Sequence, residues 1–521
     1  NTNCDGEVIS HLYEKYGEKF LSLLDGMFAI SIWDTKEKTL LLARDYPGEK
    51  PLYYSKLDNG GIAFSSEIES LSGCNLIDKN FDSQSIWDFP TFLWIPEPNT
   101  IYKKIKALMP GQYLKVNLEG RFEFKNFKSE IKAPNIFHLN QKEKIDFVRD
   151  VVEESIRSRL LSDVPIGSFL SGGLDSSIIT SVASKYVNNL KTFCIGFKDK
   201  YDPYHGNSDE SEDAAMYAAE LGIEHFNIKI DAQDFRNNLP QLIKHAGQPY
   251  AVSSGLGILS ISKLAKELGV KVLLSGDGAD EAFGGYSWYK SLQNISKMSK
   301  DFNEKAFRFY DLNDEISEKQ RRISKYKLSE RQWSLHYYGS ENEKSDLFSE
   351  KFKGDSSLRY FDHQSFDQPL DYLNHDRDFY FPNEMLSKVD RFTMANSVEG
   401  RAPFAAPNVQ LLAKQLKWDD LYKDKTLKWI LRKAFDDNLP RHIIKRKKHG
   451  FNVPIDFWLK HQWNDLLEDT FSANSKLMRL GYIDKNSRLN ALKLLNDPQK
   501  VSGHIILCYI MLNIWLENLN K

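Results

Sequence analysis

Residues 171–177 carry the residue types that bind phosphate groups: two adjacent glycines, three serines and an aspartate. They lie between an apolar run at 164–170 and a helical pattern from Ile178, which predicts a strand, a glycine-rich turn and a helix N-terminus. Free N–H groups at a helix N-terminus attract anions, and glycines let the backbone approach them. Asp175 is predicted to hold Mg²⁺ against phosphate oxygens. The alternative is a Gly/Ser turn without function, which a Ser-Gly-Gly tripeptide alone would favour.

A second group, Ser-Gly-Asp-Gly-Ala-Asp-Glu-Ala-Phe-Gly-Gly-Tyr at 275–286, follows a predicted buried strand at 271–274. Its carboxylates, Asp277, Asp280 and Glu281, alternate with glycines at the carboxyl end of that strand. Buried carboxylates are costly unless they bind cations or take part in catalysis, so the pattern predicts a functional site. An acidic surface turn is the alternative.

A third group is the basic run from Arg441 to Lys448. It could be a nucleic-acid patch, but the formal charge of the chain is −2, which gives no general attraction for nucleic acid. A solvated charged face is a better interpretation than a nucleic-acid site.

Composition places the chain among ordinary globular proteins, with 41% hydrophobic and 27% charged residues. Its 521 residues predict two or more domains. No apolar run is long enough to span a membrane. The four cysteines lie far apart without a CxxC pair, which argues against a zinc site or a disulfide scaffold and favours the reducing cytoplasm.

The hydrophobic pattern divides the chain into two parts. Residues 1–127 are predicted to form short β-strands with helices at 7–24 and 67–72, and residues 128–140 a linker. An amphipathic helix follows at 141–161, and strands and helices then alternate up to residue 274. This alternation predicts an α/β fold with a doubly wound parallel sheet, whose ligands bind at the carboxyl ends of the strands. After about residue 290 the chain is predicted to be mostly helical.

Several ordered blocks resemble known families. Asp25-Gly26-Met27-Phe28-Ala29, Gly48-Glu49-Lys50-Pro51-Leu52-Tyr53-Tyr54 and Phe64-Ser65-Ser66-Glu67 resemble class II glutamine amidotransferases. Residues 171–177, 275–286, 386–404 and 446–454 resemble the ATP-pyrophosphatase domain of asparagine synthetases. The resemblance implies a partial αββα glutaminase-type β-sandwich at 1–127 and an asparagine synthetase-type domain at 141–521.

The resemblance also implies roles for individual residues. The pyrophosphate loop would comprise Ser171, Gly172, Gly173, Asp175, Ser176 and Ser177. Phe169 and Ile195 would line the adenine pocket, Ser275 and Gly276 would contact ATP, and Asp175 and Asp280 would hold Mg²⁺. Asp277 would act on the acceptor or the incoming amine, Lys448 would neutralise phosphoryl charge during adenylation, and Asp5, in an Asp-x-Glu-Val-Ile block, would bind glutamine. Lys428 and Arg432, in a Lys-x-x-Leu-Arg element, are read as support residues.

The activity implied is an ATP-dependent amidation in which ammonia from glutamine converts aspartate to asparagine, by an enzyme that forms homodimers. In the family, the glutaminase nucleophile is an N-terminal cysteine well upstream of the Asp-x-Glu block. Cys4 stands directly beside Asp5 and does not match it. We therefore expect no glutamine hydrolysis by the chain as given, because the leading part of the domain is missing or its activity is lost.

Two departures from the family pattern concern the acceptor. Gly247-Gln248-Pro249 stands where Asp-Glu-Pro is expected, and Ala405-Ala406 follows Pro-Phe in place of Leu-Asp. They weaken the case for aspartate and leave open another carboxylate, such as a sugar uronate or a secondary-metabolite precursor. A non-catalytic binding or regulatory homologue is the other alternative, although a decayed site would have lost at least one of Asp175, Asp277, Asp280 and Lys448.

Overall fold

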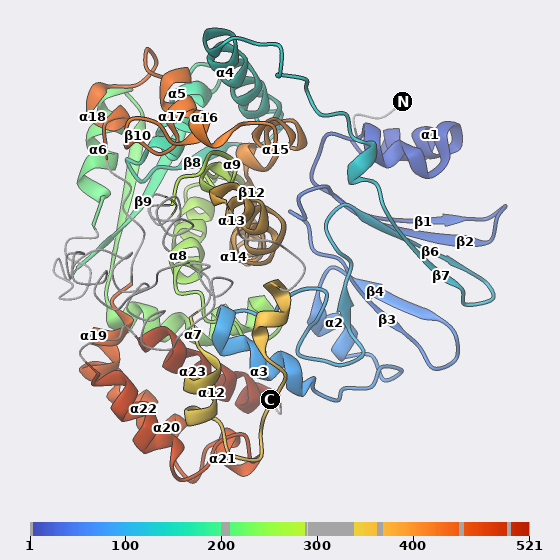
Figure 1. Ribbon diagram of the computed structural model, residues 1–521, viewed down its shortest axis with the longest axis vertical. Coiled ribbons are helices and arrows are strands. Elements are labelled where there is room, and N and C mark those ends of the chain that lie inside the picture. Colours follow the sequence, from blue (N-terminus) through green and yellow to red (C-terminus); the bar gives the residue numbers. More distant parts are fainter. Residues whose placement is uncertain are drawn as a thin grey trace.

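The computed structural model describes residues 4–198, 209–286, 289, 338–361, 368–446, 453–497 and 502–519. Two antiparallel sheets of the N-terminal part lie beside a larger part that is built around a parallel sheet and many helices (Figure 1). None of the helices in these ranges combines the length and the apolar character needed to cross a membrane.

The N-terminal part has one sheet ordered β1-β2-β6-β7 and another ordered β4-β3-β5. Alternate residues of β2 face opposite sides: Leu41 and Ala43 belong to the hydrophobic cluster of Phe20, and Leu42 belongs to the cluster of Leu52. The elements up to the linker are α1 (Glu7–Tyr16), η1 (Gly17–Leu23), β1 (Ala29–Asp34), β2 (Thr39–Arg44), β3 (Tyr53–Lys56), β4 (Ile62–Ser65), α2 (Ile68–Ser72), α3 (Ser83–Phe92), β5 (Lys106–Ala107), β6 (Gln112–Asn117), β7 (Phe122–Asn126) and η2 (Lys128–Glu130).

The helix predicted at 7–24 is interrupted. The α-helix ends at Tyr16 because Gly17 takes φ 55° and ψ −148°, a conformation outside the helical region. A 3-10 helix continues from Gly17 to Leu23 and buries Phe20 and Leu21. The apolar spacing was therefore a sound guide to the buried face but not to the type of helix.

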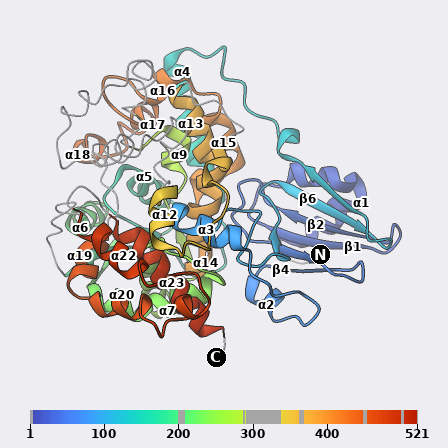
Figure 2. The same ribbon diagram turned by 60° about the horizontal axis from the view of Figure 1, so that its bottom comes forward.

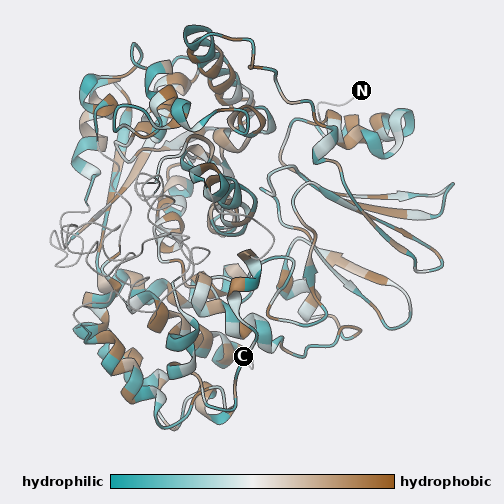
Figure 3. Ribbon diagram, viewed as in Figure 1, coloured by the Kyte–Doolittle hydropathy of each residue, from teal (hydrophilic) through white to brown (hydrophobic). Residues whose placement is uncertain are grey.

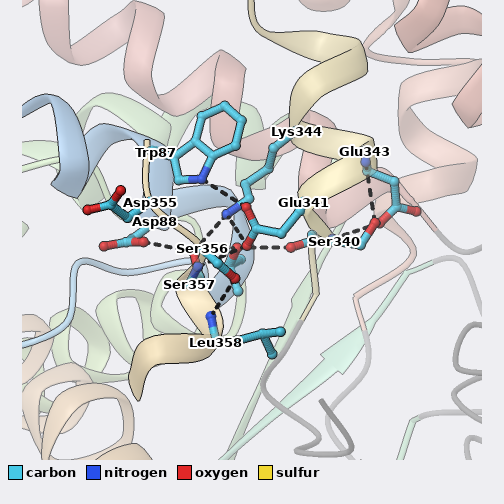
Figure 4. A network of polar contacts seen from close by, with 12 residues as sticks. Trp87, Asp88, Ser340, Glu341, Glu343, Lys344, Asp355, Ser356, Ser357 and Leu358 are labelled. Atoms are coloured by element: carbon cyan, nitrogen blue, oxygen red, sulfur yellow. Dashed lines mark hydrogen bonds and ion pairs between the residues drawn. The ribbon is translucent and has the colours of Figure 1, made fainter. Parts of the chain in front are cut away.

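Helix α3 was not predicted, and it leaves the β-rich part to pack among the C-terminal helices, beside α12 and α23 (Figures 1 and 2). The indole Nε1 of Trp87 donates to Glu341 at 3.0 Å. Asp88 accepts a hydrogen bond from the Ser357 hydroxyl at 2.7 Å (Figure 4). Lys344, which is fully buried, completes this network by donating to Glu341 and Ser357. These contacts fasten residues 83–92 to the larger part of the molecule.

The five-stranded parallel sheet is ordered β10-β9-β8-β11-β12. Its central strands are largely apolar (Figure 3). Leu273 packs in one cluster with Ile261 of α8, whereas Val272 and Leu274 on the other face belong to the cluster of Ile178 from α5. Both faces are therefore covered by helices, which confirms the α/β fold with a parallel sheet.

The chain runs outward from β8 to β9 and β10, and then returns to place β11 on the other side of β8. The loops that follow β8 and β11 therefore leave the sheet side by side at its topological switch point, where ligands bind in such sheets. The elements of this region are α4 (Gln141–Ser158), β8 (Ile166–Phe169), α5 (Leu174–Ala183), β9 (Lys191–Phe197), α6 (Ser211–Glu220), β10 (Glu224–Ile230), α7 (Ala232–Ala246), α8 (Ser254–Glu267), β11 (Val272–Leu274) and α9 (Ala279–Phe283).

The rest of the described chain is mostly helical, and helix α23 is buried along most of its length. Its elements are α12 (Glu341–Leu347), η5 (Ser357–Phe361), α13 (Pro369–His375), the π-helix η6 (Asp376–Leu386), α14 (Ser387–Met394), β12 (Glu399–Arg401), η7 (Pro403–Ala405), α15 (Pro407–Ala413), α16 (Trp418–Leu421), α17 (Trp429–Ala434), α18 (Arg441–Ile444), α19 (Ile455–Lys460), α20 (Asn464–Thr470), α21 (Lys476–Arg479), α22 (Ser487–Leu495) and α23 (Gly503–Asn518).

Candidate active site

The loop after β8 is held in shape by its own serines. The Ser171 N–H donates to the Ser176 hydroxyl at 3.1 Å, and the Ser176 hydroxyl contacts the Gly173 carbonyl at 3.2 Å. Gly172 has φ 70° and lies close to the backbone of Ala214, so a side chain is excluded there both by conformation and by space. This loop leads directly into α5, as the sequence predicted.

The loop after β11 lies against the first one. A Cβ added at Gly276 would come within 3.2 Å of both the Asp175 Cβ and the Ser176 nitrogen. The Ser275 hydroxyl donates to Asp277, and the Asp277 N–H donates back to that hydroxyl at 3.3 Å. Contact between the two loops brings together residues that are about a hundred positions apart in the sequence.

Asp175 and Asp280 converge on one position, where the Lys428 ammonium lies. Lys428 Nζ is 2.6 Å from each carboxylate oxygen of Asp175 and 2.6 Å from Oδ1 of Asp280. The Lys428 side chain is 4% exposed, and those of Asp175 and Asp280 are 15% and 12% exposed. A Cβ at Gly285 would overlap both Asp280 and Lys428, so glycine is required beside this cation position.

The donor set fits magnesium. Mg²⁺ is usually held by one or two protein carboxylates together with substrate phosphates and water, and it does not need a full cage of side chains. Asp175 and Asp280 supply two such carboxylates next to the predicted pyrophosphate loop. Within the described residues there is no group of three or more His, Cys, Asp or Glu side chains that could hold a metal ion.

Two arginines support the loop after β8. Arg446 Nη1 donates to the Gly172 carbonyl at 3.4 Å, while its Nη2 pairs with Glu210 at 2.9 Å and Asp213 at 2.7 Å. Arg432 donates to the carbonyls of Arg446 and Ile444, which fixes the segment that carries Arg446. Burial lowers the pKa of Arg432, and the nearby Asp175 and Asp280 oppose that effect.

A buried acidic and aromatic region lies next to Asp277. Burial raises the pKa of Glu281 to about 8, and the charge of Asp280 adds to the effect. Glu384 of η6 accepts hydrogen bonds from Trp94 Nε1 at 3.1 Å and from the Tyr380 hydroxyl at 2.9 Å. Burial raises the pKa of Glu384, the charge of Lys388 lowers it and that of Asp277 raises it, so both charges act on this carboxyl.

The other predicted residues are distributed as follows. Phe169 and Ile195 are partly exposed and pack against one hydrophobic cluster, beside the loop after β8. Ser177 is buried in the first turn of α5. Asp5 lies exposed before α1, where it accepts the Gly6 N–H at 2.9 Å, and is not brought together with the two loops. Lys448 lies outside the described residues.

The departures from the family pattern occupy different surroundings. Gln248 is buried, and its side-chain Oε1 accepts the Ile101 N–H at 3.1 Å, so it serves the packing of the N-terminal segment. A Cβ at Gly247, which has φ 67°, would lie 3.4 Å from Ile68. Ala405 and Ala406 are buried, and Ala405 belongs to a small cluster with Phe381 and Leu386.

Sequence reasoning underrated several residues of this site. The sequence pattern predicts only a support role for Lys428, although the Lys-x-x-Leu-Arg element that contains it is a feature of the family. Arg446 was seen as part of a basic block but had no assigned contact. Glu384 and Trp94 were not singled out, because nothing in their local sequence points to a site. Their proximity to Asp277 depends on the packing of distant segments.

Comparison with known proteins agrees with this arrangement. The family model described as "Asparagine synthase" matches residues 147–517, and the one described as "Glutamine amidotransferase domain" matches residues 1–127. "Asparagine synthetase [glutamine-hydrolyzing] 1" of Bacillus subtilis is 33% identical over 483 residues, which cover 89% of this chain and 73% of that protein. A "Putative asparagine synthetase [glutamine-hydrolyzing]" of Mycobacterium bovis is 30% identical, covering 91% of this chain and 73% of that protein. "Asparagine synthetase [glutamine-hydrolyzing] 2" of Oryza sativa is 29% identical, covering 92% and 66%. The chain belongs to the asparagine synthetase family of carbon–nitrogen ligases.

Proposed function

We propose that the protein uses ATP to activate the side-chain carboxylate of aspartate and transfers ammonia to it, forming asparagine. The observation that supports this best is the convergence of Asp175 and Asp280 on one cation position between the loops after β8 and β11. The names of the relatives add glutamine as the source of nitrogen. We further expect a homodimer, as the family resemblance implies, and a cytoplasmic location, as the four separated cysteines indicate.

In the first step, a carboxylate oxygen attacks the α-phosphorus of ATP and pyrophosphate leaves. A carboxylate is a poor electrophile at neutral pH, and the acyl-adenylate that forms has a much better leaving group. The N–H groups and hydroxyls of residues 171–177 would bind the pyrophosphate, with Arg446 bracing the loop. Mg²⁺, when bound by Asp175 and Asp280, would supply positive charge to the phosphate oxygens. Lys448 would neutralise α-phosphoryl charge.

In the second step, ammonia attacks the acyl carbon, AMP leaves and the nitrogen loses a proton. Asp277 lies half-buried at the carboxyl end of β11, with its carboxylate held by the Ser275 hydroxyl. We assign it the role of acting on the acceptor or the incoming amine. Residues 1–127 would form the domain that binds glutamine, with Asp5 as a glutamine-binding residue.

The test is a measurement of pyrophosphate release with ATP, Mg²⁺ and ammonium, with aspartate or other carboxylates added and products identified by mass. Ammonium makes the assay independent of glutamine hydrolysis. We expect release with aspartate and formation of asparagine, and Asp175→Asn should abolish both. Turnover that survives in Asp175→Asn would refute the metal role assigned to this residue.

A different carboxylate is the second candidate, and Ala405 and Ala406 are the observation that favours it. Both are small and buried where the family has Leu-Asp. Release with a uronate or a secondary-metabolite precursor, but not with aspartate, would establish this alternative. If no carboxylate gave pyrophosphate release and the protein did not bind ATP, a non-catalytic homologue would instead be favoured.

A further inference from the structure

Three lysines in the described residues are buried: Lys344, Lys388 and Lys428, with exposures of 0%, 6% and 3%. Lys344 pairs with Glu341 at 3.0 Å, and Lys428 pairs with Asp175 and Asp280. Lys388 makes no ion pair in the described part of the chain, and its ammonium contacts only the sulfur of Met385, at 3.3 Å. A thioether is a weak acceptor. A buried ammonium without a carboxylate is costly, which is unusual for a structural residue.

The position of Lys388 connects it to the proposed reaction site. It lies in the first turn of α14, one turn after Glu384. The sulfur of its contact Met385 also lies 3.3 Å from the Tyr380 hydroxyl, and that hydroxyl donates its hydrogen bond to Glu384 at 2.9 Å. Helix η6 packs against the loop after β11: a Cβ added at Gly278 would lie 2.8 Å from the Phe381 ring, and Arg377 donates to the Glu281 carbonyl at 2.7 Å. The charges of Lys388 and Asp277 also act on Glu384, so the three side chains belong to one region at the carboxyl end of β11.

Glu384 and Lys388 have the spacing at which glutamate and lysine commonly pair along a helix. They do not pair here, since no ion pair joins them within the described structure and Glu384 is engaged by Trp94 and Tyr380. A carboxyl group and an ammonium group thus lie in one region without forming a direct ion pair. Such an arrangement is complementary to a ligand that carries both an amine and a carboxylate.

We propose that Lys388 is a specificity residue that binds the carboxylate of the acceptor that is not adenylated, with Glu384 facing the acceptor's amine. This inference rests on the proposed function, because it assumes an acceptor that is activated beside Asp277. It names the acceptor class as an α-amino acid with a second carboxylate in its side chain. A uronate lacks the amine and would leave Glu384 without its partner.

The experiment compares three acceptors in the ammonium-dependent pyrophosphate assay. Aspartate has both groups, β-alanine lacks the α-carboxylate, and succinate lacks the amine. The variant Lys388→Met keeps a chain of similar length beside Met385, and Lys388→Gln is a second, polar variant. Lys414→Met is the matched control, because Lys414 is an exposed lysine that pairs with Asp378 at 3.1 Å. Melting temperatures verify that each variant is folded.

We expect Lys388→Met to lower kcat/KM for aspartate and succinate by about 10- to 100-fold, the loss of one charged hydrogen bond. Activity with β-alanine and the KM for ATP should stay within about twofold, as should every parameter of Lys414→Met. Losses of equal size with aspartate and β-alanine, or a parallel rise in the KM for ATP, would overturn the assignment while leaving the proposed function intact.

Failure of the proposed function has a different signature. Wild-type protein that is active with other carboxylates but silent with aspartate would refute the proposed acceptor. Binding would then decide about Lys388, by thermal shift with succinate in the presence of a non-hydrolysable ATP analogue. A succinate-dependent rise in melting temperature that Lys388→Met loses would support the carboxylate site, and the absence of that rise in the wild type would overturn it.

Discussion

Replacing Lys428 by methionine tests the cation position directly. The change removes the ammonium that lies 2.6 Å from both Asp175 and Asp280, and it leaves two carboxylates that are only 15% and 12% exposed. Breaking a buried ion pair by removing one partner costs about 3–5 kcal/mol. Because both carboxylates keep some contact with solvent, we expect the lower end, about 3 kcal/mol. For a chain of 521 residues that corresponds to a fall in melting temperature of roughly 3 °C.

Magnesium should reverse this loss. In the wild type the lysine must leave the carboxylates before an ion can bind, whereas in Lys428→Met the position is free of that competition. A ligand that binds only the folded state stabilises it in proportion to the logarithm of its concentration. Melting temperatures measured with 0 to about 10 mM Mg²⁺ should therefore rise more for Lys428→Met than for the wild type.

The matched control is Lys344→Met. Lys344 is also fully buried and also bound to a carboxylate, but it lies in the network of α3 and α12 (Figure 4). We expect this variant to lose stability without any extra gain from Mg²⁺. The reasoning would be refuted if Lys428→Met melted like the wild type in the absence of metal, or if Mg²⁺ raised the melting temperatures of all three proteins equally.

Three other changes follow from the geometry of the site and the core. Gly285→Ala places a methyl group onto Asp280, so single-turnover pyrophosphate release should fall by about 100-fold. Gly284→Ala is its control, because the nearest neighbour of the added methyl group would be 3.6 Å away. This control should keep activity and lose only about 1 kcal/mol of stability from the φ of 68° at Gly284. Arg446→Gln removes the guanidinium that contacts the pyrophosphate loop and should raise the KM for ATP about tenfold in steady-state assays, and an unchanged KM would exclude this support role. Burial lowers the pKa of His375 to about 4, so below pH 6.5 the unfolded chain binds a proton there that the folded protein does not. The free energy of unfolding, measured with urea, should therefore fall by up to about 3 kcal/mol between pH 7 and 4. His375→Phe should lack that decrease.

The local parts of this site could be predicted from the sequence, because each depends on a short segment. The 171–177 loop joins a strand to a helix, as its glycines and the flanking apolar patterns predict. Strand alternation also placed the loops after β8 and β11 at one edge of the sheet. Helix α3 could not be predicted in the same way, since it contains Pro90 and buries both polar and apolar faces against segments far along the chain. Its contact with Cys508 spans more than four hundred residues.

Lys388 and Lys428 show why a residue's role depends on what surrounds it in space. Lys388 lies in the first turn of α14, whereas Lys428 is the N-cap residue of α17 and has a φ of 53°. Both are buried to nearly the same extent. Lys428 is neutralised by the two carboxylates that we assign to the metal. Lys388 has no carboxylate partner in the described structure. In the free protein the proposed metal position is thus occupied by the Lys428 ammonium, while the proposed acceptor site keeps the Lys388 ammonium available. Under the proposed function, Mg²⁺ that arrived with ATP would replace the charge of Lys428 between the two carboxylates and would leave that ammonium available to the phosphates.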